Sequence, residues 1–238
     1  MRPRLFYVPI AAAFEAERVA EQVDWADVES CDSPGAGAAR GSEPRGVAGV
    51  VDSALARLEE LGWESCCIIG DSHGQAAAIE VALARPERVL AVGISHAAAH
   101  YRLEGERPAM TPAVHDAAAR LLDTDYRSFA RAITQLTLGL ADDEWIERWI
   151  AEVPQPVTQS VLGELSDRQP DLVARLADSE LPVVLGQHLG CLMWTPEAFA
   201  DARAALPHAR AVRCEGIPAQ DDAFLAAVRE ASGWVASV

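Results

Sequence analysis

A serine flanked by glycines is the clearest chemical signal in this sequence. Gly70-Asp71-Ser72-His73-Gly74 follows an apolar run at residues 66–69 and precedes a helical pattern at 75–84. Between a strand and a helix, Gly-x-Ser-x-Gly forms a sharp turn, because side chains larger than glycine would collide with both elements. The Ser72 hydroxyl is then exposed at the carboxyl edge of a sheet, and the amide of His73 points to where an oxyanion would form. The pattern predicts a serine nucleophile.

Such a serine needs a base, because its hydroxyl is a poor nucleophile at neutral pH and general-base assistance is worth roughly 10²- to 10⁴-fold. The ends of parallel strands converge on one crevice, so His96 and His188, each following an expected strand, are the candidate bases. Either histidine could instead hydrogen-bond a loop carbonyl. We expect the ring of His73 to diverge from the Ser72 hydroxyl, which leaves the His73 amide as its useful part.

The elements that must position these residues alternate along the chain. Apolar runs predict strands at residues 4–8, 28–31, 66–69, 89–94, 181–186 and 209–214. Helical spacing predicts helices at 14–23, 46–61, 75–84, 196–206 and 221–232. Strands that alternate with helices indicate βαβ units, and therefore an α/β fold with a mostly parallel central sheet and helices on both faces.

The alternation is interrupted by a long helical block at residues 101–178. A helical block inserted between two strands of a parallel sheet is most simply a cap over the carboxyl edge of that sheet. With 238 residues, the chain fits one domain of ordinary size with such an insertion. We therefore expect a core formed by residues 1–100 and 179–238 and a helical cap formed by 101–178.

Together these features resemble the α/β-hydrolase fold family, in particular its short, capped members. The resemblance covers nearly the whole chain, and its most specific parts are GDSHG at residues 70–74 and DSPGAG at 32–37, in place of the family's Asp-x-Pro-Gly-x-Gly. The resemblance implies a hydrolase that needs no cofactor, with Ser72 as nucleophile and a helical cap over the sheet.

The sequence departs from the family pattern at three places. The family usually has His-Gly before the residue whose amide completes the oxyanion hole, whereas here Pro9 and Ile10 precede Ala11, which can still donate its amide. Leu189 stands where the family has its aspartate. No histidine follows the last expected strand. The resemblance therefore implies a degenerate triad in which only the serine aligns.

Aromatic residues predict an apolar substrate pocket over the serine. Trp145 and Trp149 have i, i+4 spacing in the expected cap and would line a chamber with Trp194 below them. Pro9 and Ile10, beside the expected oxyanion hole, would belong to the same pocket. Ordinary helix packing explains the spacing of the first two tryptophans about as well.

Composition and charge exclude several functions. A formal net charge of -16 repels phosphate backbones and anionic lipids, so neither nucleic acid nor a membrane is an expected partner. No apolar run approaches the roughly 18 residues that cross a bilayer, and the five cysteines lack a C-x-x-C pair. We expect a cytoplasmic protein with reduced thiols and a small-molecule substrate. No His and carboxylate set has ligand spacing, so no metal site is predicted. The oligomeric state does not follow from the sequence.

Three functions stay open at this point. The favoured one is hydrolysis or acyl transfer on a small, largely apolar ester, thioester or lactone through Ser72, with His188 or His96 as a non-standard base. The second is a non-hydrolytic cyclase, lyase or isomerase that uses the capped chamber, where the serine and a histidine only hydrogen-bond or shuttle a proton. The third is a catalytically silent binding protein that keeps the fold.

Overall fold

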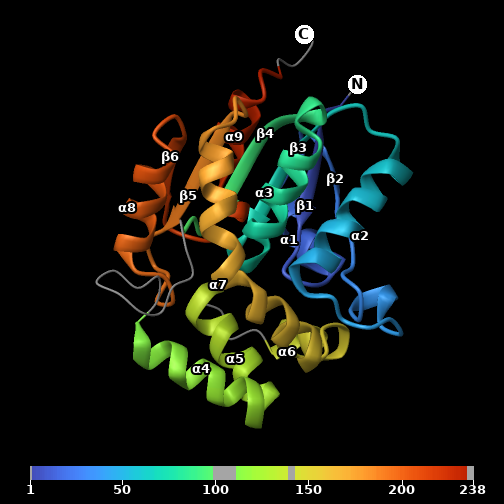
Figure 1. The fold of residues 1–238 in the computed structure, drawn as a ribbon, viewed down its shortest axis with the longest axis vertical. Coiled ribbons are helices and arrows are strands. Elements are labelled where there is room, and N and C mark those ends of the chain that lie inside the picture. Colours follow the sequence, from blue (N-terminus) through green and yellow to red (C-terminus); the bar gives the residue numbers. More distant parts are fainter. Residues whose placement is uncertain (1, 99–110, 139–142, 235–238) are drawn as a thin grey trace.

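The computed structural model describes residues 2–98, 111–138 and 143–234, and its centre is one parallel sheet (Figure 1). Six strands lie in the order β2-β1-β3-β4-β5-β6, and every neighbouring pair is parallel. The sequence prediction of an α/β fold with a parallel sheet is confirmed. The strands are β1 (Arg4–Val8), β2 (Asp27–Glu29), β3 (Cys66–Asp71), β4 (Val89–Ser95), β5 (Val183–His188) and β6 (Arg210–Cys214).

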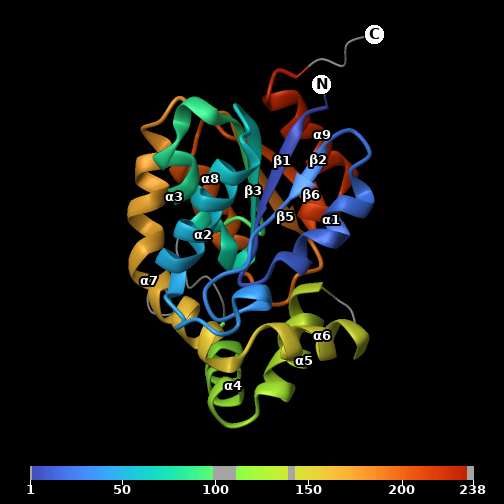
Figure 2. The ribbon, with the colours of Figure 1, turned by 90° about the vertical axis from the view of Figure 1, so that its right-hand side faces the viewer.

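Helices cover both faces of this sheet. Figure 2 shows α2, α3 and α7 on one side and α1 and α9 on the other. None of the described helices is long and apolar enough to cross a membrane. The helices are α1 (Glu17–Gln22), α2 (Gly46–Leu61), α3 (Gln75–Ala84), α4 (Pro112–Thr124), α5 (Tyr126–Leu138), α6 (Asp143–Glu152), α7 (Gln155–Ala177), α8 (Pro196–Ala205) and α9 (Asp222–Ala231).

The core follows from the alternation of side chains along the buried strands. In β3 every residue is buried, because the strand is covered on both faces. Ile68 packs with Phe6 of β1 in the cluster beneath α2 and α3. Cys67 and Ile69 point to the other face, where they pack in the cluster beneath α1 and α9. The sheet is thus held rigidly between two apolar layers.

Strand β5 both begins and ends two residues later than the sequence pattern indicates. The apolar run predicts a strand over residues 181–186, but β5 begins at Val183 and ends at His188. Pro182 lacks an N–H and contributes only its carbonyl, which accepts from Val92 N. The shift makes His188 the last residue of the strand, so the sheet fixes the direction in which its side chain leaves the backbone.

Helices α4, α5 and α6 lie beyond the carboxyl edge of the sheet, whereas α7 runs back along it (Figures 1 and 2). The N-terminal limit of the expected cap, residue 101, falls outside the described residues, and the limits 101–178 stay a prediction. Helix α7 belongs to both layers, since it starts beside α6 and then packs against α2 and α3.

A single phenol joins the capping helices to one another. The Tyr126 hydroxyl on α5 donates to the carbonyl of Val153, lies 2.9 Å from the Thr158 hydroxyl on α7, and accepts from Trp149 Nε1 on α6. These contacts fix the side of α5 and α6 that faces the sheet.

The capping helices are also joined to the segment after β1. The Phe14 ring lies 4.8 Å from the Trp145 ring, and the guanidinium of Arg148 lies 4.6 Å above Phe14. Arg148 also forms an ion pair with Glu17, and Arg18 lies 4.2 Å above the Trp145 ring. We name this group of aromatic and ionic contacts the α6 latch.

The turn between β3 and α3 leaves no room for side chains at its two glycines. A Cβ on Gly74 would lie 2.6 Å from the Val8 carbonyl oxygen, and one on Gly70 would lie 2.5 Å from Ala78 Cβ. The first collision is with backbone, which cannot rotate away. The turn therefore holds α3 against β1 at a separation that only glycine permits.

We predict that Gly74→Ala destabilises the protein by about 1–3 kcal/mol, because backbone must move to accept the methyl group. The free energy of unfolding in urea measures the effect. Gly163→Ala is the matched control, since a Cβ there meets nothing within 4 Å on an exposed part of α7, and it should be neutral or stabilising by up to about 1 kcal/mol. Equal stability of the two variants would contradict the prediction.

Candidate functional site

Two non-glycine residues of the described chain have positive φ, and both end a central strand. Ser72 follows β3 with φ 47°, and His96 follows β4 with φ 53°. Holding a residue with a side chain in this region costs of the order of 1–3 kcal/mol, and such strain gathers at functional sites. The neighbouring strands β3 and β4 therefore both close in strained turns at the same edge of the sheet.

Ser72 faces a small cavity between this edge and the capping helices. Its volume is about 60 Å³. Ile10, Trp145 and Trp149 line it, whereas Pro9 and Trp194 are not among its described lining residues. The full lining is Tyr7, Ile10, Glu15, Asp71, Ser72, His73, Phe129, Ala130, Ile133, Thr134, Trp145, Trp149 and Gln220. The cavity has an apolar roof from α5 and α6 and a polar floor from the strand ends.

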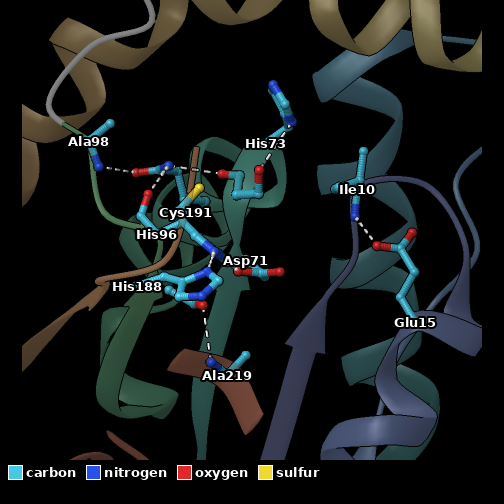
Figure 3. A network of polar contacts seen from close by, with 12 residues as sticks. Ile10, Glu15, Asp71, His73, His96, Ala98, His188, Cys191 and Ala219 are labelled. Carbon is cyan, nitrogen blue, oxygen red and sulfur yellow. Dashed lines mark hydrogen bonds and ion pairs between the residues drawn. The ribbon is translucent and has the colours of Figure 1, made fainter. Parts of the chain in front are cut away.

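The expectation for the His73 ring was wrong. Its Nδ1 lies 3.2 Å from Ser72 Oγ, and the ring rises from the turn toward the cap (Figure 3). The rotamer of His73 thus brings its Nδ1 to the serine hydroxyl. Burial lowers the pKa of His73 to about 4, although the Asp71 charge opposes the shift. The imidazole is therefore neutral near pH 7, and with this pKa it is a weaker base than an ordinary histidine.

The two histidines proposed from sequence as bases contact each other. His96 Nε2 lies 3.1 Å from His188 Nδ1, and His96 Nδ1 lies 2.7 Å from Asp71 Oδ1 (Figure 3). The two ring nitrogens of His96 thus contact Asp71 and His188 rather than the serine. Burial lowers the pKa of His96, but the Asp71 charge and hydrogen bond outweigh it and raise the value to about 10. Burial likewise raises the pKa of Asp71, yet the His96 charge brings it below its ordinary value.

Cys191 completes this cluster. Its N–H donates to the His188 carbonyl, so the turn after β5 folds back and places the thiol beside both imidazoles. Burial raises the pKa of this thiol, but hydrogen bonds from His188 and His96 outweigh burial and lower it to about 6. Trp194 also belongs here, since it lines the small cavity next to the cluster rather than the one above Ser72.

A buried carboxylate occupies the expected oxyanion hole. Glu15 accepts from the backbone amides of Ile10, Ala11 and Ala12 at 2.9–3.0 Å. Figure 3 shows the contact with the Ile10 amide. Ala11, expected to stabilise an oxyanion, thus donates to a side chain of its own chain. Burial raises the pKa of Glu15 to about 7, although the three amides lower it.

Sequence reasoning assigned no role in the site to three of these groups. Glu15 lies in an unremarkable helical pattern, and nothing in its neighbourhood signals a contact with amides. The position of Asp71 directly before the serine is only a weak indication that it belongs to the site. Cys191 carries a stronger one, because His188-x-x-Cys191 is a spacing at which a turn brings two side chains together.

Comparison with known proteins rests on structure. No protein-family model and no curated protein matches the sequence. A hydrolase from Oleispira antarctica matches with a TM-score of 0.79 at 12% identity, over 98% of this chain and 92% of its own. A haloalkane dehalogenase loop variant from Bradyrhizobium elkanii matches with a TM-score of 0.71 at 18% identity, over 98% of this chain and 89% of its own. The enol-lactonase from Burkholderia xenovorans LB400 matches with a TM-score of 0.69 at 16% identity, over 98% of this chain and 92% of its own.

The chain has the α/β-hydrolase fold. Within the α/β-hydrolase fold the acid is expected after the penultimate strand, where this chain has Leu189, a half-exposed side chain. The described residues place Asp71 and His96 side by side at the neighbouring strand ends instead.

The pKa of Glu15 predicts how stability depends on pH. A carboxyl group with a pKa raised to about 7 binds more protons in the folded than in the unfolded chain between roughly pH 4.5 and 7. His73, whose pKa burial lowers to about 4, contributes a rise in the free energy of unfolding between roughly pH 4 and 6.5. The Glu15 contribution opposes that rise and should fall by about 3 kcal/mol as the pH rises from about 4.5 to 7. Glu15→Gln should remove that contribution, as urea unfolding at several pH values would show. An unchanged slope in the variant would contradict the assignment.

Proposed function

We propose that the protein is an acyl hydrolase acting on a small, largely apolar ester, thioester or lactone, with Ser72 as nucleophile and His73 as base. One observation carries this proposal: a serine in a strained turn faces a small cavity while a neutral imidazole lies 3.2 Å from its hydroxyl. The sequence offered His188 or His96 as base. The contact between Ser72 and His73, together with the engaged nitrogens of His96, favours His73 instead.

The chemistry follows from these positions. His73 Nδ1 takes the proton from Ser72 Oγ as the oxygen bonds to the substrate carbonyl carbon, and the same proton passes to the leaving group as the bond to it breaks. Water then attacks the acyl-enzyme with His73 again as base, and the serine is restored. The oxyanion is assigned to the backbone amide of His73, the residue after the nucleophile.

The cavity favours a small substrate with little charge. The roof side chains Phe129, Trp145 and Trp149 are apolar or aromatic, whereas Glu15 and Asp71 on the floor carry or can carry negative charge. An anionic acyl group would meet both carboxyl groups in a site of low dielectric constant, where repulsion is strong. A neutral acyl group avoids this cost.

A fluorophosphonate probe tests the nucleophile. We expect covalent labelling of Ser72 in the wild-type protein, none in Ser72→Ala, and a labelling rate lower by about 10²- to 10⁴-fold in His73→Asn. The readout is the intact mass followed by peptide mapping. His208→Asn serves as the matched histidine control and should label at the wild-type rate. A folded wild-type protein that does not label would overturn the proposal.

The pH profile of labelling identifies the base. Because burial lowers the pKa of His73 to about 4, its neutral form persists well below the ordinary value of 6.5. We expect the labelling rate to stay level down to about pH 5 and to fall as the pH passes below about 4. Asp71 and His96 are the charged groups that face this ring. A rate that falls near pH 6.5 instead would exclude His73 as the base.

One observation favours a second function, non-hydrolytic acid–base chemistry. The Glu15 carboxyl holds the amides that would stabilise an oxyanion, and its pKa of about 7 suits a group that both gives and accepts protons. A lyase or isomerase would use Glu15 on a substrate in the same cavity, with Ser72 as a hydrogen-bonding group. Absence of fluorophosphonate labelling in a folded protein would support this function over hydrolysis.

A further inference from the structure

Three side chains outside the Ser72 cavity gather around one point. They are His96 after β4, His188 at the end of β5 and Cys191 in the turn that follows. One ligand atom from each lies within 4.8 Å of the others. In Figure 3 the Cys191 sulfur lies over the His96 ring, with His188 beside it. All three line a separate cavity of about 60 Å³.

The separation of the two imidazole nitrogens fits one metal ion. Zinc binds imidazole nitrogen at about 2.0–2.1 Å and thiolate at about 2.3 Å in a tetrahedron, which places two nitrogen ligands about 3.3 Å apart. His96 Nε2 and His188 Nδ1 lie 3.1 Å apart, near that separation. Imidazole and thiolate are ligands that zinc prefers over harder cations such as magnesium.

The Asp71 carboxylate supplies the support that a histidine ligand needs. Metal-bound histidines almost always donate their second ring N–H to a carboxylate, carbonyl or water, which fixes the tautomer and the ring orientation. Asp71 Oδ1 lies 2.7 Å from His96 Nδ1, so one proton of His96 is held on that nitrogen, and a metal ion would bind at Nε2 by displacing the proton there.

The same cavity provides space and a polar group for a fourth ligand. Gln187 lines it, and within the described chain its buried side-chain oxygen has no hydrogen-bond partner. Buried polar atoms are rarely left without a partner. A water molecule on the metal would have protons to donate to such an oxygen.

We propose that His96 Nε2, His188 Nδ1 and Cys191 Sγ bind one zinc ion, with Asp71 orienting His96 and a water molecule as the fourth ligand. The sequence predicted no metal site because these residues come from two separate segments that only the sheet brings together. Binding requires the thiol to lose its proton and both facing imidazole nitrogens to offer lone pairs. None of the three ligands lines the Ser72 cavity, so the inference does not depend on the proposed hydrolysis.

Titration with Zn²⁺ in competition with a chromophoric chelator tests the proposal on the whole chain. We expect one zinc ion per wild-type chain. Asp71→Asn should weaken binding by about 10- to 100-fold, the usual effect of losing a partner of a ligand. His188→Ala and Cys191→Ser should weaken it further. His208→Ala is the matched control and should bind as the wild type does.

A second measurement needs no substitution and so does not depend on how the variants fold. Cys191 is the partly exposed cysteine, and the other four are buried: Cys31, Cys66, Cys67 and Cys214. Equimolar Zn²⁺ should slow alkylation of Cys191 by iodoacetamide in the wild-type protein, as mass spectrometry would show, while Mg²⁺ should not.

Two outcomes would overturn the proposal. One is the absence of stoichiometric zinc binding with unprotected alkylation of Cys191, which would leave the cluster as a thiol held by two imidazoles. The other is zinc binding that His188→Ala and Cys191→Ser do not weaken, since the ion would then lie elsewhere on this acidic protein. Protection of Cys191 together with weakened binding in both variants would support it, whatever the result of labelling at Ser72.

Discussion

The buried hydrogen bond between Asp71 and His96 is the interaction on which this edge of the sheet depends. A carboxylate removed from water is costly unless a partner charge and hydrogen bonds offset the loss of hydration. His96 supplies both at 2.7 Å, and it does so from a turn whose φ is itself unfavourable. Gln75 binds the two turns together, because its side chain donates to the Ser72 carbonyl and accepts from the amide of Ala98. Polar contacts between the two strand ends thus hold Ser72 and His96 in their unfavourable backbone conformations.

Asp71 also connects two chemically different cavities. It lines the one above Ser72, while its partner His96 lines the one beside Cys191. The nucleophile proposed for the first cavity and the metal proposed for the second therefore share one carboxylate. Changes at Asp71 would alter the charge near the serine and the orientation of His96 together.

Much of the fold could be predicted because its signals are local. The helices α2 and α3 begin and end at the residues that periodicity and Gly62 indicated, and β1 coincides with its apolar run. The site was less predictable, because its contacts join distant segments. Ala11 was assigned an oxyanion role from its position after β1, but a carboxylate four residues later reaches back to its amide. The contact of His73 with the serine depends on a side-chain rotamer, which sequence spacing does not encode.

The α6 latch has a consequence for how the chamber selects its contents. Phe14, Glu17 and Arg18, which hold Trp145 and Arg148, are close neighbours of Glu15 on the same short stretch of backbone. The stretch that sets the negative charge on the chamber floor thus also anchors its aromatic ceiling. For the substrate proposed above, a shift of the Glu15 backbone would therefore alter both the charge on the floor and the position of the aromatic side chains above it.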